Sequence, residues 1–277
     1  MNNCSQHYST LWVKRGEGLQ HKQMKVSACI VTYKCCETSR QAIRTLLEQT
    51  KGTDLTLYVV DNNSQDDTLE RLSGEFPDIV AVQNRHNKGF GNGHNTVLPM
   101  LDSEFHVVVN PDIELDRDVI GELCRYLSEN PDIGMITPMI RYPDGHDQQL
   151  PKRDPVVLSL VGRHIFRKRL KGIVQHYQML DEDLSEVCDI EFATGCFFVI
   201  RTELFKKLGG FDERWFIYYE DMDITRRARA VARAVYYPHT YVYHAWARSS
   251  SRKLKYFIIL VLGMFKYFNK WGWKIHY

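Results

Sequence analysis

The sequence predicts an α/β fold built on a mainly parallel β-sheet flanked by helices. Over the first 140 residues, short apolar and β-branched runs alternate with segments of helical periodicity, the order expected when helices cross over between parallel strands. Three of the strand-like runs end in polar clusters, at residues 32–33, 61–64 and 110–112. Because ligands of open α/β sheets bind beyond the carboxyl ends of the strands, we expect these clusters to converge on one crevice.

Each element up to residue 140 follows from local pattern. The run KVSACIVTY at 25–33 is almost entirely apolar or β-branched, as in a strand buried on both faces of a sheet. Further strands are expected at 55–60, 79–82, 105–109 and 133–140. Helices are expected at 37–50, 66–75, 96–101 and 116–129, the first from the spacing of Ala42, Ile43, Leu46 and Leu47.

The second half of the chain is less regular. Residues 141–190 contain a turn at 143–145 and a basic run from Arg163 to Lys171, typical of a variable loop or of short helices. A strand is expected at 192–201 and a helix at 202–208. The sequence at 234–244 predicts two short extended segments that end at His244.

The tail from Arg252 to Tyr277 is both basic and apolar. Its unbroken apolar run, residues 257–265, is flanked by lysines and followed by Trp271 and Trp273. This run is about half of the roughly 20 residues that a membrane-spanning helix needs, so we expect an amphipathic helix that lies in the membrane interface. The alternative is a terminal helix packed on the domain.

Length and composition limit the class of protein. A chain of 277 residues can bury a full core, and its formal net charge of +2 does not suggest a nucleic-acid-binding protein. Seven cysteines without a CxxC pair indicate reduced thiols in a cytosolic protein. Residues 1–24 are polar, so we expect a disordered extension rather than a secretory signal.

Residues 210–227 have an unusual density of acidic and aromatic side chains, with five of each. An apolar, ring-rich setting would raise or tune the pKa of a carboxylate among Glu220, Asp221 and Asp223, as a general base requires. The alternative is structural, since acids in the first turn of a helix complement its dipole and can pair with Arg226 and Arg227.

Three further groups could contact a ligand. The cluster at 61–64 could recognise a base or a ribose, although such residues also form turns. The glycines at 89–93 could let the backbone approach a ligand, but the GxGxxG fingerprint is absent, which disfavours dinucleotide binding. Asp112, held rigidly after Pro111, could bind a hard divalent cation against a diphosphate, with His244 as a further ligand.

Six segments, taken in order and with their spacing, carry a family resemblance. They are VTYK (31–34), VVDNNSQDDT (59–68), NKGFGNGHN (87–95), NPD (110–112), GGFDERWFIYYEDMDITRR (209–227) and VYHAWARSS (242–250). Together they resemble the inverting family 2 glycosyltransferases, which have the GT-A fold, and most of all the bacterial rhamnosyltransferases of O-antigen and cell-wall assembly. The resemblance implies a GT-A domain at 25–250, between the extension 1–24 and a membrane-associating helix at 251–277.

The resemblance also implies a role for each matching residue. The nucleotide sugar would be bound by Thr32, Tyr33, Asp61, Asn62, Gly89, Phe90, Asn95, Asn110 and Asp112. A divalent cation, Mg²⁺ or Mn²⁺, would be held by Asp112 and His244. Asp221 would be the catalytic base, supported by Glu220. The acceptor side would be shaped by Gly195, Asp212, Trp215 and Phe216. The family's DxD motif reads NPD here, with one acid in place of two.

The implied reaction is the metal-dependent, inverting transfer of L-rhamnose from dTDP-L-rhamnose to a glycan on a polyprenyl diphosphate, in the synthesis of lipopolysaccharide or another surface polysaccharide. The enzyme would lie on the cytoplasmic face of the inner membrane, attached by its tail. Two alternatives stay open: a transferase of the same fold with another donor, such as a UDP-hexose, and a catalytically silent scaffold that binds nucleotide sugars. The presence of Asp112, Asp221 and His244 together disfavours the scaffold.

Overall fold

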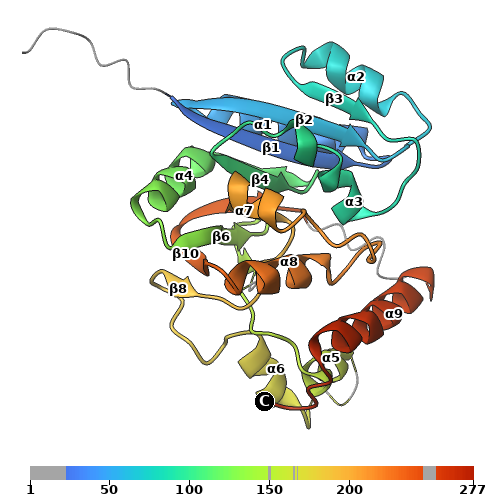
Figure 1. The fold of residues 1–277 in the computed structure, drawn as a ribbon, viewed down its shortest axis with the longest axis vertical. Coiled ribbons are helices and arrows are strands. Elements are labelled where there is room, and N and C mark those ends of the chain that lie inside the picture. The colour runs from blue at the N-terminus through green and yellow to red at the C-terminus, as the bar shows by residue number, and fades with distance from the viewer. Residues whose placement is uncertain (1–22, 149–150, 165, 167, 246–253) are drawn as a thin grey trace, which may run out of the picture.

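A mixed β-sheet forms the centre of the computed structural model, which describes residues 23–148, 151–164, 166, 168–245 and 254–277. The strands within these residues are β1 (Met24–Thr32), β2 (Thr53–Asp61), β3 (Val80–Gln83), β4 (Phe105–Val109), β5 (Ile113–Glu114), β6 (Ile133–Arg141), β7 (Asp147–Gln148), β8 (Cys188–Asp189), β9 (Phe197–Arg201) and β10 (Arg233–His244). Their order is β3-β2-β1-β4-β9-β6-β10-β5, with β7 on β6 and β8 on β10 (Figure 1).

The predicted α/β fold with a mainly parallel sheet is confirmed. Parallel pairing joins β3, β2, β1 and β4, and joins β6 to β10. Strand β9 lies antiparallel between β4 and β6, so the two parallel groups point in the same direction. The carboxyl ends of both groups therefore open onto one edge of the sheet, which is where a ligand site is expected.

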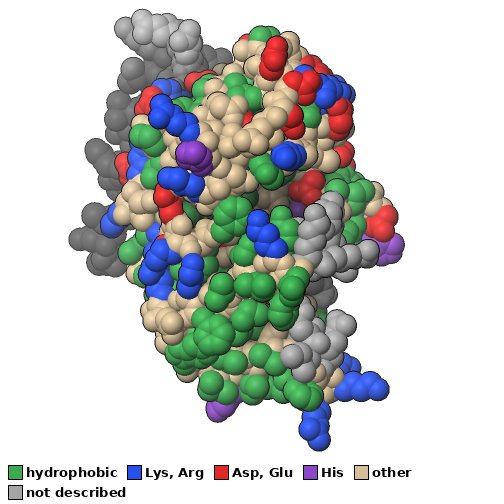
Figure 2. Space-filling model, turned by 90° about the vertical axis from the view of Figure 1, so that its right-hand side faces the viewer, with side chains coloured by type: hydrophobic (Ala, Val, Ile, Leu, Met, Phe, Trp, Pro, Cys, Tyr) green, Lys and Arg blue, Asp and Glu red, His purple; other side chains and the backbone are tan. Residues whose placement is uncertain are grey.

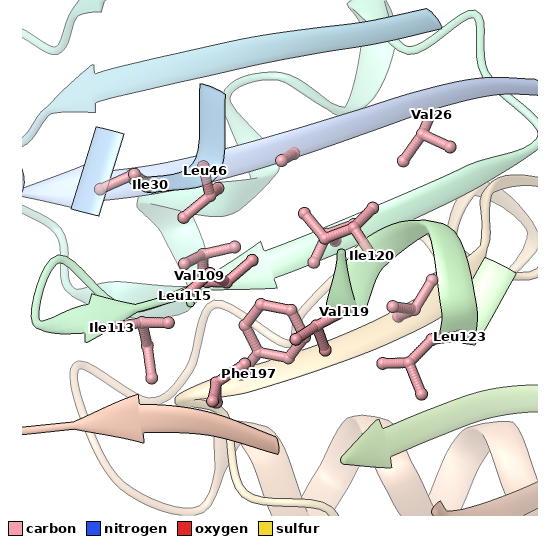
Figure 3. Packing of buried hydrophobic residues seen from close by; sticks show 14 of the residues in the cluster. Val26, Ile30, Leu46, Val109, Ile113, Leu115, Val119, Ile120, Leu123 and Phe197 are labelled. Atoms are coloured by element: carbon pink, nitrogen blue, oxygen red, sulfur yellow. The ribbon is translucent and has the colours of Figure 1, made fainter. Parts of the chain in front are cut away.

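Helices cover both faces of the sheet. They are α1 (Cys36–Gln49), α2 (Thr68–Glu75), α3 (Phe90–Asn95), α4 (Val119–Glu129), α5 (Val157–His164), α6 (Lys171–Tyr177), α7 (Thr202–Lys207), α8 (Glu220–Arg229) and α9 (Leu254–Trp271). Apolar residues of α1, α2 and α4 pack on one face, and those of α7, α8 and the segment after α3 pack on the other. Figure 3 shows the first core, where Val119, Ile120 and Leu123 of α4 meet the strands and Phe197 of β9.

Three predicted elements differ from the structure. The helix expected at 96–101 lies earlier, as α3, and only a 3₁₀ turn with Pro99 follows it at Leu98–Met100. The strand expected at 192–201 begins only at Phe197, because residues 195–196 form a turn. The two segments expected at 234–244 form one strand, β10, with a register shift between Tyr237 and Tyr241, where Pro238 cannot donate to the ladder.

The tail forms a helix, as expected. A third apolar cluster joins α9 to the segment before α8 and to α5, through residues that include Trp215, Tyr219, Tyr267 and Phe268. Within the described residues, no helix has the combination of length and hydropathy needed to cross a bilayer. The six cysteines among all the described residues are free thiols. Residues 1–22 of the expected extension lie outside the described residues, and Met24 belongs to β1.

Candidate active site

A strained turn places two carboxylates at the start of α8. Tyr218 and Tyr219 are both left-handed, with φ of 72° and 68°, a conformation that costs about 1–3 kcal/mol at non-glycine residues and persists only where packing enforces it. Tyr219 is buried against Tyr267 of α9, with ring centres 5.8 Å apart. A Cβ on Gly263 of α9 would lie 2.7 Å from the Tyr219 ring. Close packing of α9 therefore holds the turn that delivers Glu220 and Asp221.

Asp221 is held by two backbone N–H groups. Its Oδ2 accepts from Gly195 (3.0 Å) and its Oδ1 from Met222 (2.9 Å). Burial raises the pKa of Asp221, while these N–H groups and the Lys152 ammonium act in the opposite direction. The Gly195 position leaves little room, since a Cβ there would lie 3.1 Å from the Asp221 Cβ. A fixed, partly desolvated carboxylate of this kind is suited to general-base catalysis.

Glu220 holds a proton at neutral pH. Burial, and then the neighbouring charge of Asp221, raise the pKa of Glu220 to about 8. Its Oε2 is buried without a hydrogen-bond partner among the described residues. Because the two carboxyls titrate as a pair, burial makes the pair retain a proton to a higher pH than two exposed carboxyls would.

Asp112 and His244 meet at the end of the sheet, as the sequence predicts. His244 pairs with Ile113 in the β10–β5 ladder, and its Nε2 lies 3.4 Å from Oδ1 of Asp112. Gln148 fixes the imidazole: its amide donates to the His244 carbonyl (2.7 Å), so its Oε1 faces Nδ1 at 3.1 Å. With Nδ1 donating to Gln148, the lone pair of Nε2 lies on the side of Asp112, so that one cation could bind both groups.

These two groups fit the predicted cation site in kind, since an imidazole nitrogen and a carboxylate oxygen both bind Mn²⁺ and Mg²⁺. In the described part of the chain, no group of three or more His, Cys, Asp and Glu side chains converges as a complete site. The pair would therefore hold a cation together with oxygens of a bound diphosphate or water.

Four of the nine residues expected to bind the nucleotide sugar are buried, namely Thr32, Asp61, Asn62 and Gly89. Thr32, Asp61 and Asn62 are each at most 3% exposed. Asp61 accepts from the N–H of Ser64 (2.9 Å) and from Gln83 (2.7 Å). Thr32 accepts from Ser39. Tyr33, in contrast, is 46% exposed.

The glycine loop is tied to the segment before α8. The Phe90 N–H donates to the Phe216 carbonyl (2.9 Å), and a Cβ on Gly89, whose φ is +99°, would lie 1.9 Å from that same oxygen. The Asn62 amide donates to the Gly89 carbonyl (3.0 Å). Asn95 exchanges two hydrogen bonds of 2.8 Å with the Phe211 backbone. The predicted nucleotide and acceptor segments therefore lie side by side.

The four residues expected on the acceptor side separate into two kinds. Gly195 lies directly against Asp221, and Phe216 is 38% exposed beside the glycine loop. In contrast, Trp215 is buried against α9, with its indole N–H directed at the Gly263 carbonyl (3.4 Å). Asp212 is engaged by Arg214 and by Lys270 (2.8 Å). The last two therefore fasten α9 to the domain in this structure.

Sequence reasoning missed Lys152, Gln148 and Phe211. Lys152 is buried close to Asp221, Gln148 orients His244, and Phe211 forms an aromatic wall with Phe90 and His94. Lys152 stands in the segment between β7 and α5, long before Asp221 in the sequence, so only the fold brings it to the site. Its neighbours Pro151, Arg153 and Asp154 give no sequence signal for such a role.

Comparisons with known proteins show the family to which the chain is similar. A family model described as "Glycosyl transferase family 2" matches residues 27–209. The N-acetylglucosaminyl-diphospho-decaprenol L-rhamnosyltransferase of Mycobacterium tuberculosis is 27% identical over 214 residues, which are 72% of this chain and 69% of that protein. A low-salt glycan biosynthesis hexosyltransferase of Haloferax volcanii is 27% identical over 74% of this chain and 61% of its own length.

A solved structure supports the fold. The mannosyltransferase of Pyrobaculum calidifontis, in complex with GDP-Man and Mn²⁺, superposes on 83% of this chain with a TM-score of 0.58 and 19% identity. The superposition covers 59% of the mannosyltransferase chain. At this level of identity the likeness concerns the arrangement of strands and helices.

Glu220 gives the stability of the chain a testable pH dependence. An unfolded chain releases the Glu220 proton near pH 4.5 and the folded chain near pH 8, so between these values the folded state holds the extra proton. The free energy of unfolding must then fall as the pH rises through this window, by up to about 1.4 kcal/mol per pH unit from this group.

We predict that Glu220→Gln loses less stability than the wild type between about pH 5.5 and about pH 8.5, measured by urea unfolding. Glu203→Gln, at an exposed position of α7, is the matched control and should follow the wild type. Parallel pH profiles for the wild type and Glu220→Gln would contradict the assignment of a raised pKa to Glu220.

Proposed function

The chain belongs to glycosyl transferase family 2, and from this membership we propose that it transfers L-rhamnose from dTDP-L-rhamnose to a glycan carried on a polyprenyl diphosphate. The observation that carries the proposal is that two pairs of side chains, Glu220 with Asp221 and Asp112 with His244, are both connected to the turn formed by Gly195 and Cys196. Gly195 donates to Asp221, and the Cys196 carbonyl accepts from Asn110 (2.8 Å), two residues before Asp112.

Asp221 is the proposed base of a single displacement. It removes the proton of the acceptor hydroxyl, whose oxygen bonds to the anomeric carbon as the bond from that carbon to the diphosphate oxygen breaks. The electron pair of the broken bond leaves with the nucleoside diphosphate, and the anomeric configuration inverts. The N–H groups of Gly195 and Met222 fix the direction of the carboxylate, and neutral Glu220 does not compete for the proton.

Asp112 and His244 are the proposed residues that hold a divalent cation. When bound, the cation would neutralise charge on the leaving diphosphate. The fixed tautomer of His244 supports this role, because Gln148 occupies Nδ1 and leaves Nε2 directed at Asp112. The Mn²⁺ in the structure of the Pyrobaculum mannosyltransferase is consistent with it.

The proposal of rhamnose and of a lipid diphosphate acceptor is supported by the name of the mycobacterial relative and by the motif pattern of the sequence. A second transferase proposal, with a UDP-hexose as donor, uses the same base and the same cation pair, since neither group reads the sugar. A silent scaffold has no use for a buried carboxylate fixed by two backbone N–H groups, so the geometry of Asp221 disfavours it.

The outer side of α9 supports attachment to a membrane surface. Five large apolar side chains recur at helical spacing on it, each at least 46% exposed: Leu254, Phe257, Ile258, Leu262 and Phe265. Figure 2 shows hydrophobic side chains gathered over the lower part of the face on which α9 lies. The opposite side of α9 packs on the domain through Gly263, Tyr267 and Phe268. Packing and interfacial binding are therefore compatible, and we propose that the enzyme works at the cytoplasmic face of the inner membrane.

A donor panel tests the proposed function. Labelled nucleotide sugars are incubated with the full chain and with membrane lipids that contain polyprenyl-diphosphate glycans. We expect transfer from dTDP-L-rhamnose, with loss of transfer after chelation of divalent cations and recovery on adding Mn²⁺ or Mg²⁺. Transfer from a UDP-hexose instead would establish the second donor. If no donor reacts although the acceptor lipids are present, the transferase proposal is wrong.

Replacing the base should separate turnover from binding. Asp221→Asn should lower turnover by about a hundredfold or more, the range expected for loss of a general base, while the affinity for nucleoside diphosphate changes little. The control is Asp78→Asn, at an exposed position, which should keep wild-type turnover. Near-wild-type turnover in Asp221→Asn would remove Asp221 from the mechanism.

The exposed side of α9 should govern membrane attachment. Because truncation would also uncover Trp215, the better test is the double variant Phe257→Ser with Phe265→Ser, measured by flotation with vesicles that contain anionic lipid. We expect a several-fold smaller bound fraction and only a small change of melting temperature, since both rings are about half exposed, Phe265 with one side against the Trp273 ring. Val231→Ser, at a position 56% exposed away from α9, should bind like the wild type. Equal flotation of all three proteins would exclude this side of α9 as the attachment surface.

A further inference from the structure

A buried lysine lies beside the catalytic carboxyls, and the mechanism above does not use it. Lys152 is only 5% exposed, although lysine is among the residues least often buried. Its carbonyl accepts from the N–H groups of Glu191 (3.1 Å) and Phe192 (2.9 Å). Its Nζ lies 4.9 Å from the centre of the Phe192 ring. The side chain is therefore fixed at the start of the segment that runs through the site.

That segment connects Lys152 with the Glu220–Asp221 pair and with the Asp112–His244 pair. Three residues after Phe192, Gly195 donates to Asp221 (3.0 Å). One residue later, the Cys196 carbonyl accepts from the backbone N–H of Asn110, two residues before Asp112 (2.8 Å). The ammonium that lies over Phe192 is therefore held at the start of the segment that contacts both the proposed base and the strand end before Asp112.

The electrostatics agree with this placement. Burial raises the pKa of the Cys196 thiol to about 12; the Asp112 carboxylate adds to the rise and the Lys152 ammonium opposes it. The same ammonium opposes the rise that burial causes in the pKa of Asp221. Lys152 is thus within electrostatic reach of the middle of the site, where Asp112 and Asp221 also act.

We propose that the Lys152 ammonium binds a phosphate group of a diphosphate substrate. The inference rests on the proposed glycosyl transfer, in which a diphosphate must lie between the base and the Asp112–His244 pair. A buried ammonium offers a phosphate oxygen a charge-assisted hydrogen bond, and exclusion of water strengthens it. Two substrates could present this chemistry, the nucleoside diphosphate of the donor and the polyprenyl diphosphate of the acceptor.

The test uses the full chain with three substitutions. Lys152→Met removes the charge and keeps the length of the side chain, and Lys152→Arg keeps the charge. Lys51→Met removes an exposed lysine from the turn before β2 and serves as the control. Calorimetric titration with dTDP and with UDP in the presence of Mn²⁺ measures the donor side. The KM for a polyprenyl-diphosphate acceptor, compared with an alkyl-linked acceptor that lacks the diphosphate, measures the acceptor side.

If Lys152 binds a phosphate group of the donor, Lys152→Met should weaken nucleoside diphosphate binding by about tenfold or more, as expected for a hydrogen bond to a charged group. If Lys152 binds a phosphate group of the acceptor, Lys152→Met should still bind nucleoside diphosphate, and its KM should rise by about tenfold for the diphosphate acceptor alone. In either case Lys152→Arg should keep most of the function, and Lys51→Met should match the wild type.

Wild-type behaviour of a folded Lys152→Met in both measurements would overturn the inference. If Lys152→Met does not fold, Lys152→Gln replaces it. Should neither neutral variant fold while Lys152→Arg does, the charge serves the fold and the inference is also overturned. A wild-type protein that binds neither dTDP nor UDP would instead refute the proposed glycosyl transfer, on which the role of Lys152 rests.

Discussion

The buried carboxylate of Asp223 joins helix α8 to helix α9 in the tail. It is fully buried in α8 and is met by Arg227 of the same helix (2.7 Å) and by Lys270 (2.6 Å) and the Trp271 indole (2.9 Å) of α9. Because an isolated buried charge is very costly, α8 and α9 must stay together. The left-handed turn at Tyr218 and Tyr219 is packed against the same helix, so the direction of Asp221 depends on α9.

Helix α9 therefore takes part in two aspects of the proposed function, the placement of the base and the attachment to a membrane. The inner side of α9 supports the turn that delivers the base, and its outer side carries the exposed apolar stripe. At the other side of the site, the paired ends of β5 and β10 bring Asp112 to His244. The sheet thus fixes the cation pair, whereas the base is fixed by packing between helices.

Much of the sheet and half of the site follow from sequence pattern. Apolar runs with polar ends locate β1, β2 and β4, and parallel pairing then brings Thr32, Asp61 and Asn110 to one edge. Sequence pattern cannot show tertiary contacts between distant segments. Trp215 and Asp212 contact α9, and Lys152 reaches the site only because its backbone pairs with Phe192. Helix α3 forms where Gly91 and Gly93 allow close packing, against their low helix propensity.

The central claim is that one carboxylate, Asp221, acts in a single displacement across from a leaving diphosphate. The most direct measurement is the anomeric configuration of the product, determined by NMR spectroscopy on transferred sugar labelled at its anomeric carbon. The account predicts the configuration opposite to that of the donor. A product with the configuration of the donor would require a second displacement or a front-side reaction, and would contradict the role assigned to Asp221.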